Sequence, residues 1–82
     1  MEKKFLDLIA KIKMVDDGKL YRKLVFESEL TKQEEKLLMY IKILRDYVRL
    51  SKEEDIKDSI QSSFDSGLRT AIKIVEEYNG MK

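Results

Sequence analysis

The chain has 82 residues, of which 43% are hydrophobic and 40% are charged, and its formal net charge is +1. This length accommodates one domain at most, and the apolar content is too high for a disordered chain. The sequence contains no Cys and no His, which excludes disulfides and thiol chemistry and removes the commonest general base and transition-metal ligand.

Helical signals dominate the sequence, which has no Pro and only three Gly. The first expected helix covers residues 2–15, where five apolar residues recur at helical spacing: Phe5, Leu8, Ile9, Ile12 and Val15. Asp16-Asp17-Gly18 predicts a turn, with an acidic side chain available to cap the helix that follows.

Two more helices are expected, over residues 19–28 and 32–50. Thr31-Lys32-Gln33-Glu34 is a capping box, in which the Thr hydroxyl and the Glu carboxylate each accept a backbone N–H. The helix that it opens has a wide apolar face, which indicates contact with more than one neighbour. That face consists of Leu37, Ile41, Leu44 and Val48, flanked by Tyr40 and Tyr47.

Ser51-Lys52-Glu53-Glu54 is a second capping-box pattern and predicts a break after Leu50. The alternative is one unbroken helix with Ser51 on its surface. After the break we expect a helix over residues 52–79, about 40 Å long at 1.5 Å per residue. The whole of residues 1–82 is then one all-α domain, a three- to four-helix bundle with a long C-terminal helix.

The long helix carries an apolar seam that contains Gly67, although a glycine inside a helix costs about 1 kcal/mol relative to alanine. Ser63 and Ala71 lie four residues to either side, so small residues share one ridge and allow another helix to approach closely. That helix belongs either to the same chain or to a second copy or a foreign protein. In the second case the projecting end of the long helix would carry an apolar patch. The predicted packing or interface residues are Ser63, Phe64, Gly67, Ala71, Ile74 and Tyr78.

Charged clusters have simpler explanations than ligand binding. Lys42, Arg45 and Arg49 share a polar helix face and, with the basic N-terminal helices, are candidates for polyanion contact; the alternative is an ordinary solvated face. A helix-turn-helix centred on Gly67 is disfavoured, because Lys73 stands where a buried apolar residue is expected. The acidic residues Glu53, Glu54, Asp55 and Asp58 suit the positive end of a helix dipole, so no metal site is predicted.

The segment SFDSGLRTAIKIVEEY, residues 63–78, resembles the C-terminal helix of small uncharacterised proteins of Firmicutes phages and mobile elements. The shared pattern is an aromatic residue, a glycine three positions later, and an apolar helix that ends in acidic residues. The resemblance covers only the last quarter of the chain. It implies an accessory or regulatory protein, and it supplies neither an activity nor site residues.

Together these patterns predict a non-enzymatic protein–protein interaction module: a small regulator, inhibitor or adaptor that presents a helical face and self-associates. No catalytic constellation and no cofactor-binding motif is visible. The alternatives are a nucleic-acid-binding transcriptional regulator and an immunity or antitoxin-type protein that neutralises a toxin. No apolar run approaches the roughly 20 residues that cross a bilayer, and charges interrupt the N-terminal segment, so we expect a cytoplasmic protein.

Overall fold

The computed structural model describes residues 1–52 and 57–80, and these residues contain no β-strand. The predicted all-α class is therefore confirmed. The elements along the chain are α1 (Glu2–Met14), a short turn (Val15–Gly18), α2 (Lys19–Phe26), α3 (Lys32–Leu50) and α4 (Lys57–Gly80).

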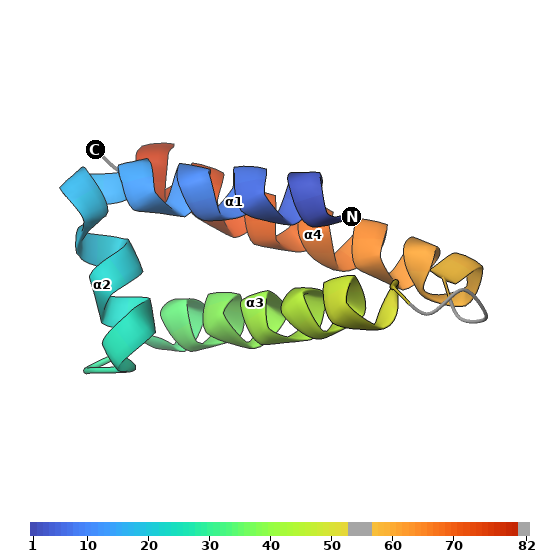
Figure 1. The fold of residues 1–82 in the computed structure, drawn as a ribbon. Helices are drawn as coiled ribbons and strands as arrows, with labels where there is room; N and C mark the ends of the chain where they lie inside the picture. The colour runs from blue at the N-terminus through green and yellow to red at the C-terminus, as the bar shows by residue number, and fades with distance from the viewer. Residues whose placement is uncertain (53–56, 81–82) are drawn as a thin grey trace.

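The three longer helices lie alongside one another, and the short α2 crosses one end of the molecule (Figure 1). α3 runs antiparallel to α4, and these two helices share the most extensive packing. α1 lies beside α4 and also contacts α3. Since α1 and α3 both pack on α4, the three helices enclose a common core.

Every helix contributes to this core, whose largest fully buried side chains include Leu8, Ile12, Leu37, Leu44 and Phe64. These are the residues that recur at helical spacing in the sequence. Burying one such side chain contributes about 1.5–3 kcal/mol to folding, which offsets the loss of chain entropy.

The start of α3 matches the predicted capping box. The Glu34 N–H donates to Thr31 Oγ1 at 3.2 Å, and the Thr31 N–H donates to the Glu34 carboxylate at 2.8 Å. Both groups are among the backbone donors that a helix start leaves without an intrahelical partner. The box is therefore confirmed on both of its bonds.

The predicted acidic cap of α2 is wrong. The N-cap is Gly18, and no side chain caps the helix there. The reason is the turn geometry, because Asp16, Asp17 and Gly18 all have positive φ, at 50°, 54° and 87°. An N-cap side chain normally works from extended backbone, and neither acidic residue of the turn adopts that conformation.

α2 ends at Phe26, two residues earlier than expected, because Glu27 has a left-handed φ of 51°. Its N–H donates to the Lys23 carbonyl, and the Ser28 N–H also reaches that carbonyl, at 3.3 Å. Such endings usually carry Gly, since a non-glycine residue costs about 1–2 kcal/mol in this conformation. The sequence therefore gave no signal for the true end.

The break after α3 lies where it was predicted, and the alternative of an unbroken helix is wrong, because the chain leaves the helix at Ser51. Ser51 Oγ donates to the Val48 carbonyl at 2.7 Å, so this hydroxyl closes the end of α3. Glu53 and Glu54, which would complete the second capping box, lie outside the described residues. In the ranges 1–52 and 57–80, no helix combines the length and apolarity needed to cross a membrane.

Candidate functional site

An apolar groove lies between α1, α2 and α3, with a volume of about 340 Å³. No residue of α4 lines it, so the groove is on the side of the α1–α3 pair that α4 leaves uncovered. Its apolar lining consists of Phe5, Ile9, Tyr21, Leu24, Val25, Leu38 and Ile41.

The width of the apolar stripes on α1 and α3 explains why the groove exists. One edge of each stripe, represented by Leu8 and Leu44, is fully buried in the core. The other edge, represented by Ile9 and Ile41, is only half-buried and faces the groove. On α2, Val25 remains 56% exposed. The fold thus leaves apolar side chains of three helices in contact with water at one place.

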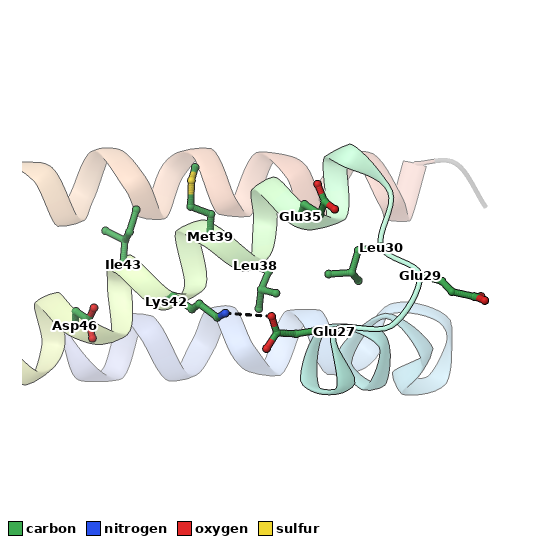
Figure 2. Close-up of a pocket in the computed structure, with 9 residues that line it drawn as sticks. All are labelled: Glu27, Glu29, Leu30, Glu35, Leu38, Met39, Lys42, Ile43 and Asp46. Carbon is green, nitrogen blue, oxygen red and sulfur yellow. Dashed lines mark hydrogen bonds and ion pairs between the residues drawn. The ribbon is translucent and has the colours of Figure 1, made fainter.

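The rim of the groove carries two cations of α3, Lys42 and Arg45. Lys42 Nζ lies 3.2 Å from Glu27 Oε1, which offsets its charge (Figure 2). Arg45 forms no ion pair with any other residue of the described ranges. On the α1 side, Lys13 Nζ lies 4.9 Å from the centre of the Tyr21 ring, close enough for a cation–π contact. The balance of charge around the groove is positive.

A second, shallower hollow of about 700 Å³ covers the outer face of α3 and shares Glu27, Leu38 and Lys42 with the groove. In Figure 2, Met39 and Ile43 point toward the α4 side of α3, away from the shared residues. Both are exposed, at 49% and 36%. The remaining lining of this hollow is acidic or apolar: Glu29, Leu30, Glu35 and Asp46.

The residues predicted to form a packing ridge lie mostly inside the chain. Phe64, Ala71 and Ile74 are buried, Tyr78 is half-buried, and Ser63 is exposed. None of them lines the groove.

Gly67 faces α3, and a Cβ added there would lie 3.2 Å from Leu44 Cδ2 and 3.6 Å from Tyr40 Cδ1. The close helix crossing that the sequence predicted is therefore made within one chain, by α3 and α4.

The exposed large apolar side chains lie elsewhere. Across the described ranges, α4 has no such residue. The exposed large apolar residues lie on α1 (Leu6 and Met14), α2 (Val25 and Phe26) and α3 (Met39 and Ile43). The apolar patch expected on a projecting end of the long helix is absent from residues 57–80. Sequence reasoning missed the groove, although the wide stripe of residues 32–50 was a signal for a second neighbour.

The three cations proposed for polyanion contact do not form one uncompensated surface. Lys42 pairs with Glu27, and Arg49 NH2 lies 3.5 Å from Asp46 Oδ1. Arg45 is the member of the set that remains without an ion pair among the described residues.

A buried polar cluster joins α2, α3 and α4 at the end of the molecule where α3 begins. Glu34 is only 4% exposed, and its carboxylate accepts from the Thr31 N–H at 2.8 Å and from Lys23 Nζ at 2.9 Å. Burial raises the pKa of Glu34, but these bonds outweigh it and hold the pKa below its ordinary 4.5. Burial also raises the pKa of the Tyr78 phenol, and the nearby Glu34 charge adds to that rise. The cluster satisfies its own charges, so its role is structural.

The acidic cluster at the start of the long helix is described only at Asp58, which is exposed in the first turn of α4. Glu53, Glu54 and Asp55 lie outside the described residues. Within the described ranges, no three Asp or Glu residues converge in a way that would hold a metal ion.

Comparison of the chain with protein-family models, curated proteins and solved structures finds no match. The resemblance of residues 63–78 to proteins of phages and mobile elements stays a prediction.

Proposed function

We propose that the chain is a protein–protein interaction module that seats part of a partner protein in the groove between α1, α2 and α3. The observation that supports this proposal is the convergence of apolar side chains from three helices on a surface that α4 leaves open. Apolar surface gains about 25 cal/mol for each Å² removed from water, so covering the groove favours association. Clustered exposed apolar residues of this kind typically mark an interaction surface.

In this proposal the domain is a small bundle in which α4, the longest described helix at 24 residues, supports α1 and α3 from behind. Support from a packed core holds the groove walls in place before a partner arrives, which lowers the entropy cost of binding. A domain of this kind acts as a regulator, inhibitor or adaptor. An immunity or antitoxin-type protein would use the same binding mode.

Two competing expectations have weaker support. Nucleic-acid binding through Lys42, Arg45 and Arg49 would compete with the carboxylates that already pair with Lys42 and Arg49. Self-association through the Gly67 ridge would require opening the α3–α4 contact. Neither requirement applies to a partner that enters the groove.

Site-specific photo-crosslinking in the producing cells tests the proposal. A benzophenone amino acid replaces Val25 in the groove, and the same amino acid replaces Arg69 on the exposed side of α4 as a matched control. We expect a discrete adduct with one identified protein from position 25 and none from position 69. Identical adduct patterns from the two positions, or none from position 25, would overturn the proposal.

A further inference from the structure

We infer that the groove receives an acidic amphipathic helix of a partner protein, which packs against α1 and α3 as a further helix of the fold would. This inference depends on the proposed function and specifies the shape and charge of the partner segment.

The shape of the occupant follows from the walls. α1 and α3 run in opposite directions alongside one another, so the groove between them has helical walls on both sides (Figure 1). The backbone groups of such walls are already bonded within each helix, and an added β-strand would find no edge to pair with. A helix needs only side-chain contacts and packs at about 8–10 Å from each neighbour.

The length of the groove suits two turns of helix. Its lining on α3 extends from Leu38 to Arg45, a step of seven residues and about 10 Å along the axis. A helix that presents apolar anchors at positions i, i+4 and i+7 covers the same distance. α2 closes one end of the groove through Tyr21 and Val25, so the bound helix begins or ends there.

The positive charge beside the groove indicates that the partner helix is acidic. Arg45 has no ion-pair partner within the described residues, so a carboxylate beside the apolar anchors can bind its guanidinium without displacing an existing pair. Such pairs are often bidentate and give orientation as well as affinity. A cation at the same place would face Arg45 and Lys42 together.

A second copy of the chain is a poorer occupant. Within the described ranges, α3 has an exposed face that combines carboxylates with apolar residues, with Glu35, Met39 and Ile43, and α1 has another, with Glu2, Leu6 and Asp7. α1 and α3 are also the walls of the groove, so in a closed two-fold dimer one helix would have to supply a wall with one face and the occupant with another. Non-reciprocal docking would build rings or open chains of molecules.

Three synthetic peptides of about 16 residues, roughly 24 Å of helix, test the inference with the full chain. The first carries Leu anchors at i, i+4, i+7 and i+11 with flanking Glu, the second replaces Glu by Lys, and the third scrambles the first. Binding is followed by ¹⁵N–¹H NMR titration. We expect the acidic amphipathic peptide to shift resonances of Val25, Leu38 and Ile41, and the basic peptide to bind at least about tenfold more weakly.

Paired variants assign the contacts. Arg45→Glu should reverse the preference between acidic and basic peptides, whereas Arg69→Glu on α4 should leave it unchanged. Val25→Asp should abolish binding, and Phe26→Asp, which changes an exposed apolar residue of the same helix outside the groove, should not. Far-UV circular dichroism establishes that each variant is folded.

The inference is overturned if millimolar acidic peptide leaves the groove resonances unmoved, if the scrambled or basic peptide binds equally well, or if the groove resonances shift with the concentration of the chain alone. The last result would identify a second copy as the occupant. A specific crosslink at position 25 combined with no peptide binding would leave the proposed function standing and remove only the helix. Failure of both experiments would remove both.

Discussion

Gly67 of α4 faces Leu44 of α3 so closely that an added Cβ would lie 3.2 Å from Leu44 Cδ2, a few tenths of an ångström too near. Leu44 is fully buried, so its side chain cannot move into solvent to make space. Tyr40 contacts the same site from the preceding turn of α3. The glycine therefore fixes how closely the two longest described helices pack.

The first prediction follows from this contact. Gly67→Leu should lower the free energy of unfolding by about 1–3 kcal/mol or more, because the larger side chain overpacks the crossing. Gly67→Ala should stay within about 1 kcal/mol of wild type, since the gain in helix propensity is opposed by the displacement of Leu44. Thermal and urea denaturation followed by circular dichroism measure both. The control is Ser66→Leu on the exposed side of α4, and equal melting of Gly67→Leu and wild type would contradict the argument.

The tight crossing could be predicted because small residues at a spacing of four lie on one helix face. The identity of the crossing helix could not, since residues 2–15 and 32–50 both carry apolar stripes wide enough to pack there. The groove could not be predicted from the sequence for the same reason. Periodicity shows that Ile9 and Ile41 are on apolar faces, but only the placement of α4 decides which edge of each face stays open.

Some helix ends could also be predicted from the sequence, and others could not. The capping box of Thr31 and Glu34 was predictable because its two hydrogen bonds are local in sequence. The left-handed residues Asp17 and Glu27 were not, because neither position carries the glycine that normally signals this conformation. Burial of Glu34 also escaped prediction, since it depends on Lys23 and Tyr78 from other helices.

The second prediction concerns Glu34. Glu34→Ala should destabilise the fold by about 1–2 kcal/mol, because it breaks the capping box and leaves the Thr31 N–H without its carboxylate acceptor. Glu34→Gln keeps an oxygen for that N–H and loses mainly the pair with the part-exposed Lys23, so its cost should be below about 1 kcal/mol. Urea denaturation separates the two. A loss for Gln as large as that for Ala would contradict this, because it would show that the charge matters more than the cap.

The third prediction is that the difference in stability between wild type and Glu34→Gln depends on pH. The folded-state pKa of Glu34 is lowered from 4.5, so its contribution is complete above that pH and is lost as pH falls through the folded value. The advantage of wild type over Glu34→Gln should therefore shrink toward zero in acid. Urea denaturation of both proteins at a series of pH values measures it. An advantage that grows in acid would mean that the folded pKa of Glu34 is raised.

At alkaline pH, Tyr78 gives the opposite dependence: the stability of the fold falls as the pH rises. The pKa of Tyr78 is raised above 10.0, chiefly by burial, so folding favours the neutral phenol and its contribution is lost as pH rises through the ordinary value toward the folded one. Tyr78→Phe should flatten the loss of stability of the fold in alkali. Spectrophotometric titration of wild type and Tyr78→Phe gives an independent reading, since the difference between the two curves should show a phenol whose pKa lies above 10.0.

A further prediction tests the turn between α1 and α2. Gly18 has a φ of 87°, which disfavours any residue with a Cβ, although the space beside it is open apart from the Lys13 carbonyl at 3.8 Å. Gly18→Ala should cost about 1 kcal/mol or slightly more. Gly18→Asn should cost less, because Asn tolerates left-handed backbone better than Ala does. Equal stability of all three proteins would show that the turn adopts another conformation in solution.

The last prediction is the mass of the protein in solution, measured by size-exclusion chromatography with light scattering over a dilution series. A stable interface buries about 800 Å² on each partner. The Gly67 ridge cannot supply that area, because it already packs on α3. We therefore expect the mass of one chain at micromolar concentration, for wild type and for Ser63→Leu, which adds bulk to the exposed end of the ridge. A concentration-independent dimer would place an outer face in an interface and restore self-association, and loss of that dimer in Val25→Asp would identify the groove as the face involved.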